Sequence, residues 1–337
     1  MAEFNFTQAV AATTWTIEHN MDAAGVVMDI IIDNTGTLEK ALPTSTVETD
    51  SNTITVTFPS AQSGYARLIE GGSQVTASIG YTIGDISSAT YDSKVYNTGG
   101  STNSLHFKQD GTMFWVINQS AHNVNQYSLS TAWDISTSSN DAVSFDLTNE
   151  SANSMGVVIS TDGTKMYILD NDRNLYQYTL GTAWNITTAV YDNASVLFNE
   201  ALQLMDFTIT DEGTALYMVS AQTDKVYQYA LGTAWDINTL VYNSKNISAG
   251  ASNGTLRDII ITPDGSQMMV IDDSDFESEK TWLYDLGTNF DVTTAILNST
   301  FEYTFSVYPA VIALNDDGTK MYIGDLASDI YQYSTNI

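Results

Sequence analysis

The sequence contains no cysteine and only four prolines in 337 residues. Without cysteine the chain can form neither disulfides nor thiolate metal sites, so cysteine usage gives no information on the redox compartment. Few prolines together with 11% aromatic residues suit twisted, well-packed strands. No run of about 18 apolar residues occurs, so no membrane-spanning helix is predicted. Residues 1–30 lack a basic segment followed by an apolar core, and we expect no signal peptide.

Positive charge is also scarce, with 11 Lys+Arg against 40 Asp+Glu and a formal net charge of −29. Nucleic acids and anionic membrane surfaces repel such a polyanion. We therefore expect neither a nucleic-acid partner nor membrane insertion. Diffuse acidity of this kind is more typical of solubility or adaptation to high salt than of a binding site, and it is consistent with a saline extracellular setting.

Residues 1–72 are predicted to form a separate small β domain. Residues 14–19 and 53–58 alternate apolar and polar side chains, as half-buried strands do. Residues 26–32 form a more continuous apolar run, which indicates a strand buried on both faces. Residues 63–68 supply a last strand, and turn residues separate these segments. A short flexible joint follows at residues 70–75.

The remainder, residues 73–337, contains a repeat of 50 to 53 residues marked by an acidic residue and a glycine in a tight hairpin, as in Asp162-Gly163-Thr164-Lys165. The motif glycines are Gly111, Gly163, Gly213, Gly265 and Gly318. Glycine fits such a hairpin because it accepts positive φ at little cost. Each repeat holds four strand candidates, for example residues 155–160, 165–169, 175–180 and 189–197. This period and content predict the blades of a β-propeller.

A tryptophan recurs every 51 residues, at Trp133, Trp184 and Trp235. A ring in this position can wedge between adjacent blades and bury a large apolar area. The rival interpretation is an aromatic cage for a ligand. Recurrence in register in three repeats favours the structural interpretation.

The two ends of the repeat region predict a closed ring of five blades. Residues 81–92 are a shortened copy of the outer-strand region at 178–192, without its Thr-Ala-Trp. The chain ends after a third strand, so the last blade lacks a fourth strand of its own. Residues 89–96 are predicted to fill that place, which removes the exposed edges of an open array. The fold class predicted is all-β: a small N-terminal β-sandwich followed by a five-bladed β-propeller closed by its N-terminal outer strand.

Binding residues are expected on variable loops of this scaffold. The hairpin face is nearly the same in every repeat, whereas the loops between second and third strands differ. Two of these loops are rich in oxygen ligands: they hold Asp170 and Asp172, and Asp272 and Asp275. Calcium favours such groups, but neither loop fits the twelve-residue calcium loop. Solvated turn carboxylates are the preferred interpretation, and we expect no metal and no cofactor.

A second set of candidates lies at the start of the innermost strands, seven residues before each motif glycine. Here Asp206 and Asp258 are predicted to face the channel from neighbouring blades. Paired carboxylates can hydrolyse glycosides. Only two of the five blades offer one, however, and His106 lies in another register. Ser-His-Asp, Walker and dinucleotide motifs are absent. We expect a protein that is not an enzyme.

Both parts of the chain resemble known protein families. The pattern Trp15-Thr16-Ile17-Glu18-His19-Asn20, then residues 50–58, then Ser63-Gly64-Tyr65-Ala66 resembles a small β-sandwich of bacteriophage tail-fibre and other virion proteins. That family has W-x-I-x-H-N, D-x-N-T-x-x-x-x-F and S-G-x-A, and commonly a leucine where this chain has Met21. The repeat region resembles Asp-Gly-Thr-Lys-Met-Tyr propellers of bacterial and phage surface proteins, a motif that indicates fold and says little of activity.

The resemblances imply a phage virion component, such as a fibre, spike or decoration protein. It would attach to other virion proteins through residues 1–72, with a homotrimer as one arrangement, and project the propeller toward a host surface, most plausibly its glycans. Two alternatives stay open: a free, lectin-like carbohydrate-binding propeller, and a five-bladed glycosidase.

Overall fold

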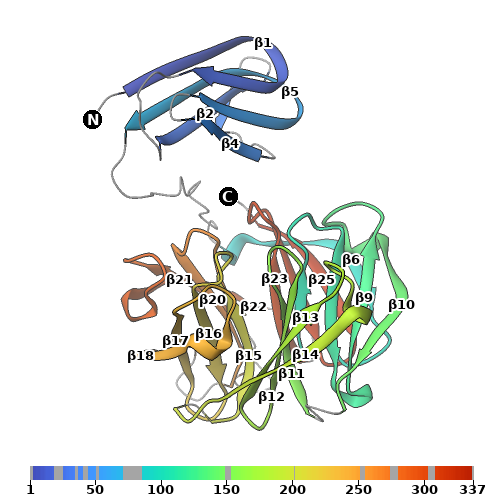
Figure 1. Cartoon of the computed structure of the whole chain (residues 1–337). Coiled ribbons are helices and arrows are strands. Elements are labelled where there is room, and N and C mark those ends of the chain that lie inside the picture. Colours follow the sequence, from blue (N-terminus) through green and yellow to red (C-terminus); the bar gives the residue numbers. More distant parts are fainter. Residues whose placement is uncertain are drawn as a thin grey trace. The chain divides into compact units, whose positions relative to one another are not determined.

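The computed structural model describes residues 3–18, 26–34, 37–40, 45–50, 53–70, 86–148, 153–200, 202–250, 255–273, 280–302 and 308–335. The chain divides into two compact units, Met1–Ile79 and Gly80–Ile337. The predicted boundary after residue 72 falls within residues 71–85, outside the described residues. Regular structure in the described part consists of strands and short 3-10 turns, which confirms the all-β class (Figure 1).

The first unit contains β1 (Glu3–Glu18), β2 (Val26–Asn34), β3 (Thr37–Lys40), β4 (Ser45–Asp50) and β5 (Thr53–Glu70). They form one hydrogen-bonded sheet in the order β1-β5-β2-β3, with β4 also on β5. The predicted alternation is visible in β1, where Thr14 and Thr16 are exposed and Ile17 is buried. Residues 53–58 and 63–68, predicted as separate strands, are parts of β5. A register shift opposite residues 8–14 of β1 separates the half of β5 that pairs with β4 from the half that pairs with β2.

The second unit is a ring of five four-stranded antiparallel sheets, as predicted (Figure 1). Blades 1 and 2 are β7 (Leu105–Phe107), β8 (Met113–Asn118), β9 (Asn123–Leu129) and β10 (Ser138–Asp146), then β11 (Ser154–Ile159), β12 (Lys165–Asp170), β13 (Asn174–Leu180) and β14 (Ala189–Leu197). Blades 3 and 4 are β15 (Leu204–Ile209), β16 (Ala215–Ser220), β17 (Lys225–Leu231) and β18 (Leu240–Ser248), then β19 (Leu256–Ile261), β20 (Gln267–Asp272), β21 (Lys280–Leu286) and β22 (Ala295–Glu302). Blade 5 is β23 (Pro309–Leu314), β24 (Lys320–Asp325) and β25 (Asp329–Ser334), completed by β6 (Thr90–Asn97).

The pairing of β6 with β25 confirms closure by an N-terminal outer strand. Tyr91 lies opposite Tyr333, and Tyr96 lies opposite Ile330. The strand spans residues 90–97, one residue beyond the predicted 89–96 at its end. Because β6 pairs with β25, the outer edge of β25 is covered and the fifth blade has four strands like the others.

Each acidic-Gly hairpin needs glycine for two reasons, which blade 2 illustrates. Gly163 has φ of 72°, and its amide donates to the Ser160 carbonyl at 2.8 Å. The Asp162 carboxylate accepts the Thr164 amide at 2.9 Å and fixes the turn. The indole of Trp184 lies directly on the glycine, where a Cβ would come within 2.4 Å of the ring. A side chain here would therefore be strained and would displace the ring.

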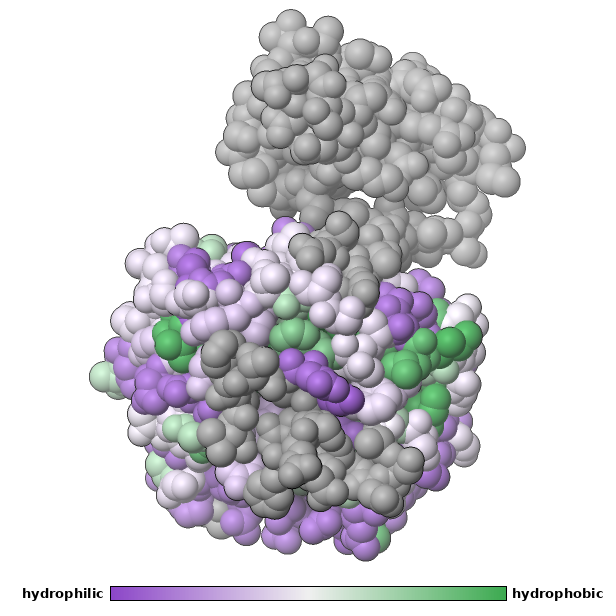
Figure 2. All heavy atoms as spheres, turned by 180° about the vertical axis from the view of Figure 1, so that it is seen from behind, coloured by the Kyte–Doolittle hydropathy of each residue, from purple (hydrophilic) through white to green (hydrophobic). Residues whose placement is uncertain are grey.

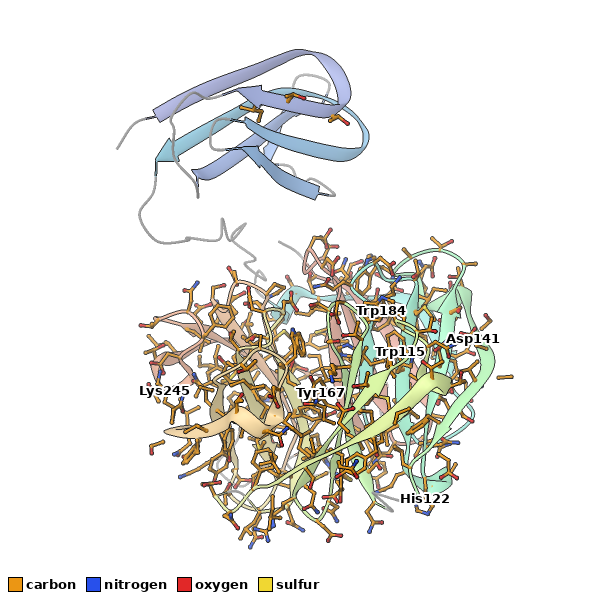
Figure 3. All side chains as sticks on the ribbon, in the orientation of Figure 1. Trp115, His122, Asp141, Tyr167, Trp184 and Lys245 are labelled. Atoms are coloured by element: carbon orange, nitrogen blue, oxygen red, sulfur yellow. The ribbon has the colours of Figure 1, made fainter. Side chains whose placement is uncertain are left out.

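The recurring aromatic rings lie between blades. Trp184 of blade 2 stacks on Trp115 of β8 in blade 1, with centroids 5.9 Å apart, and Figure 3 labels both. Trp235 stacks on Tyr167 of β12 in the same way at 6.0 Å. The matching pair across the closing seam is Trp133 and Tyr322, at 6.3 Å. In blade 4 a phenylalanine, Phe290, covers the motif glycine instead. All three tryptophans are half-buried.

The third strands carry a glutamine that joins neighbouring blades, at the centre of Tyr-Gln-Tyr in blade 2. The side chain of Gln177 donates to Asp192 of its own blade at 2.8 Å and accepts the Ile237 amide of blade 3 at 3.2 Å. Partial burial acts to raise the pKa of Asp192, but hydrogen bonds from Thr179, Gln177 and Lys165 outweigh it and hold that pKa below its usual value. The same link recurs from Gln228 to the Val292 amide and from Gln332 to the Ile135 amide, at 3.2 and 3.0 Å.

We predict that Trp184→Ala lowers the free energy of unfolding by about 3 kcal/mol, the low end for a buried aromatic ring, because this ring is half-buried. Val190→Ala is the matched control: its side chain is 66% exposed on the outer strand, and the change is expected to stay within about 0.5 kcal/mol. Urea denaturation of both variants measures the difference. A midpoint for Trp184→Ala equal to that of the control would mean that the ring is not a structural wedge.

Candidate functional site

The innermost strand of every blade faces a common axis, where the structure contains a cavity of about 160 Å³. Residues of β7, β11, β15, β19 and β23 line it, together with Trp133, Trp184 and Trp235 near the hairpin face. An engineered protein cavity of about 150 Å³ holds one benzene molecule. The channel therefore has room for one small molecule or a few waters.

Asp206 and Asp258 both line this cavity, from β15 and β19. Their exposed fractions are 2% and 4%. Asp206 accepts the Phe207 amide at 2.8 Å and a hydrogen bond from the Ser104 side chain of blade 1. Asp258 accepts its neighbour's amide, Ile259, at 2.6 Å and the Ile312 amide of blade 5 at 2.7 Å. Each carboxylate is thus held by hydrogen bonds within the ring, and Asp258 bridges two blades.

Burial controls the protonation of this pair. It raises the pKa of Asp206 well above the usual value, and the charge of Asp258 raises it further. Burial also raises the pKa of Asp258 to about 7, against the opposing effect of the Ile312 and Ile259 amides. Two interacting carboxyl groups in one buried site cannot both ionise readily. At neutral pH the pair therefore retains protons.

His106 of β7 also lines the cavity, in a different register from the two aspartates. Burial lowers its pKa to about 4, although a hydrogen bond to the backbone of Ile159 opposes the shift. The imidazole is neutral at pH 7 and does not act as a counter-ion for the carboxyl pair.

A second pair of carboxylates, Asp211 and Asp316, lines the mouth of the channel on the hairpin side and was not predicted from the sequence. Gln109 donates to Asp211 at 3.2 Å. Partial burial and the charge of Glu212 raise the pKa of Asp211. Partial burial and repulsion from Asp211 raise the pKa of Asp316 to about 7, although both side chains are exposed at the mouth. Both residues stand two positions before a motif glycine. The other three repeats have Gln109, Thr161 and Pro263 at this position, so an alignment of the five repeats reveals both aspartates.

The loop carboxylates on the opposite face fix turns. Asp170, 3% exposed, accepts the Asn174 amide at 2.7 Å and the Tyr176 hydroxyl at 3.1 Å. Asp272, fully buried, accepts the Thr255 amide at 3.0 Å. Both side chains are therefore built into the fold at the ends of second strands.

The other two loop candidates, Asp172 and Asp275, form no metal site with Asp170 and Asp272 in the described part of the chain. Asp172 is exposed in the turn after β12. Asp275 lies outside the described residues. Among the residues that the structure describes, no three His, Cys, Asp or Glu side chains are grouped to hold a metal ion. No described helix is long and apolar enough to cross a membrane.

No protein-family model matches the chain, and no curated protein matches its sequence. Among solved structures it is similar to a Bacteroides uniformis protein provisionally named a 6-phosphogluconolactonase, with a TM-score of 0.45 and 13% identity over 69% of this chain and 66% of that one. A Bacteroides fragilis protein of the same provisional name has a TM-score of 0.43 and 11% identity over 65% of this chain and 61% of that one. The chain covers less than two thirds of either, and similarity at this level has no bearing on its activity.

The close packing around Asp206 gives a direct test of the site. A Cβ on Gly156 of β11 would come within 2.4 Å of the Asp206 carboxylate and 2.8 Å of the Phe207 ring. We predict that Gly156→Ala costs about 1–3 kcal/mol of stability through overpacking. Gly181→Ala is the control, because its nearest neighbour would be 3.6 Å away. Equal unfolding midpoints for the two variants would show that the inner end of the channel is not packed as described.

Proposed function

We propose that this protein is a structural component of a bacteriophage virion, attached to the particle by its N-terminal unit and contacting the host surface through its propeller. The observation that carries the proposal is the independence of the ring. All five blades, the closing strand β6 included, are made by the second unit. The first unit is therefore not needed to complete the ring, and attachment gives it a role. The tail-fibre-like pattern of residues 15–20, 50–58 and 63–66 supports a virion as the place of attachment.

We propose further that the propeller binds rather than catalyses. The two channel aspartates accept hydrogen bonds from backbone amides, and Asp258 links two blades through them. A glycosidase pair instead flanks a sugar bond, with one group free to protonate it and room for the substrate between them. A cavity of about 160 Å³ lined by packed strands does not suit a polysaccharide.

The contact surface proposed is the face that carries the turns after β8, β12, β16, β20 and β24. Each described turn begins at a residue that caps it, as Asn118, Asp170, Ser220 and Asp325 do. The residues that follow differ from blade to blade. Variable turns on a rigid scaffold are where binding specificity usually lies.

The charge of the propeller favours a neutral or cationic partner. In the described part of the ring the following basic residues pair with carboxylates within 3.0 Å: Lys94, Lys108, Lys165, Lys245, Arg257, Lys280 and Lys320. Figure 2 shows hydrophilic residues spread over the face seen there, with smaller hydrophobic patches between them. The large exposed aliphatic side chains Val190, Val241 and Ile296 occupy equivalent outer-strand positions on three separate blades. Uncharged host glycans fit this surface better than anionic polymers.

A free, lectin-like propeller is the second candidate, supported by the same turns. The two proposals differ in what residues 1–72 do. Attachment predicts that they bind other virion proteins, as monomers or as a trimer, whereas a free lectin has no need of the particle.

The test uses purified phage particles. We expect mass spectrometry to find the protein on them, and we expect the full chain to rebind particles that lack it. The chain starting at residue 80 is expected to remain a folded monomer that does not rebind. Rebinding by the isolated propeller at the level of the full chain, or complete absence of the protein from particles, would contradict attachment through the N-terminal unit and favour the free lectin.

A further inference from the structure

The channel of the propeller gathers acidic groups from several blades without a described cation to balance them. Asp206 of β15 and Asp258 of β19 face its inner end, beside the neutral His106 of β7. Asp211 and Asp316 face its mouth. Asp110, Glu212 and Asp317 surround that mouth and add to the negative field.

No lysine or arginine is among the residues that line this cavity in the described part of the ring. The basic residue beside the channel strands, Lys108, is held by Asp110 at 2.5 Å, and its ammonium lies 5.5 Å from the centre of the Trp184 ring. Uncompensated carboxylates in a confined site are costly, and such groups take up protons instead.

We propose that the channel is a pH-sensitive brace: protonated carboxyl groups hold the inner strands together under mildly acidic conditions, and loss of these protons at higher pH weakens the ring. The brace does not depend on the virion role. It acts on the propeller as a whole because the groups involved come from, or contact, all five blades.

The contacts show how protonation reaches the whole ring. Asp206 of blade 3 receives a hydrogen bond from Ser104 of blade 1, and Ser104 in turn accepts the Val157 amide of blade 2 at 3.1 Å. Asp258 of blade 4 accepts the Ile312 amide of blade 5. Protonation leaves the carboxyl its carbonyl oxygen as an acceptor, turns the other oxygen into a hydroxyl and removes the charge that burial disfavours. Ionising both carboxyls keeps the acceptors but adds like-charge repulsion between blades.

The direction of the effect follows from linkage. Free aspartate has a pKa of about 3.9. Burial raises the pKa of Asp258 to about 7 and that of Asp206 well above its usual value. Between about pH 4 and 7 the folded state therefore binds more protons than the unfolded state. The stabilisation is fully present below the unfolded pKa and is lost as pH rises through the folded pKa.

Two other sets of groups act in the opposite direction. The lowered pKa of His106, about 4, contributes stability that is lost as pH falls from about 6.5 toward 4. Asp92, Asp134, Asp192 and Asp291 have pKa values below the usual one, because hydrogen bonds and lysine partners outweigh partial burial. Their stabilisation is lost below about pH 4. The ring should consequently be most stable in mildly acidic solution, and the window from pH 6.5 to 8 isolates the channel carboxyls from the histidine.

The experiment is urea denaturation of the full chain from pH 5 to 8 at constant ionic strength. We expect the unfolding equilibrium constant to rise with pH above 6.5, by up to tenfold per pH unit for each proton that the folded state retains. Asp206→Asn keeps an acceptor for Phe207 and mimics the protonated side chain. It should flatten this dependence and raise the urea midpoint at pH 8 relative to the unmodified chain, but not at pH 5.

Asp316→Asn provides a second variant at the accessible mouth, in case Asp206→Asn does not fold, and should flatten the dependence in part. Asp172→Asn is the control, because this exposed carboxylate lies in a turn on the opposite face. It should leave the pH dependence unchanged. Stability that is constant or increasing from pH 6.5 to 8, or an unaltered dependence in every channel variant that folds, would overturn the proposal.

Discussion

Three of the five blade interfaces share one interaction, in which two side chains of one blade hold the short turn of the next. A second-strand tyrosine donates its hydroxyl to the backbone carbonyl of the following blade's aromatic residue, as Tyr167 does to Trp235 at 2.5 Å. A third-strand glutamine accepts the amide two residues further on, as Gln177 does from Ile237. The turn thus has its polar backbone groups satisfied by its neighbour, and the aromatic ring fills the space between them.

The same pair of hydrogen bonds closes the ring. Tyr322 and Gln332 of blade 5 hold the carbonyl of Trp133 and the amide of Ile135 in blade 1, at 2.6 and 3.0 Å. Lys94 of β6 adds an ion pair to Asp134 at 2.8 Å. Between blades 4 and 5 other side chains make the links. The Ile312 amide donates to Asp258 at 2.7 Å and the Ile86 amide donates to the Ser299 hydroxyl at 3.3 Å. Met269 and Leu283 pack in one cluster with Ile86. Polar and apolar contacts therefore both join these two blades.

Much of the fold was predictable because a repeated structure repeats its sequence. Five blades and their closure were predicted from three features: the acidic-Gly hairpin, the recurring aromatic residue, and the copy of an outer strand at the start of the repeat region. The continuity of β5 was not predictable: Pro59 and Gly64 look like strand breakers, and tertiary pairing overrides them. Pro59 lies in the register shift against β1, where its missing amide costs little.

The site was predicted less fully than the fold. Asp206 and Asp258 were singled out as a pair by their position in the repeat, and the structure places both in the channel lining. Besides the amide of the next residue, each has a hydrogen-bond partner on another blade, more than 50 residues away, and no local pattern reveals that partner. The role of the third-strand glutamine was also missed, since its amide acts across a blade boundary while its neighbours in Tyr-Gln-Tyr draw attention as strand formers.

The hydrogen bonds that hold the turn of the following blade are tested most directly by native-state hydrogen exchange. The amides of Ile135, Ile237 and Val292 begin short 3-10 turns, and each donates to a buried glutamine of the preceding blade. We predict that all three exchange as slowly as the amides of the inner strands, and that Gln177→Ala accelerates exchange at Ile237 far more than at the other two. Rapid exchange at these amides in the unmodified protein would contradict these hydrogen bonds between blades.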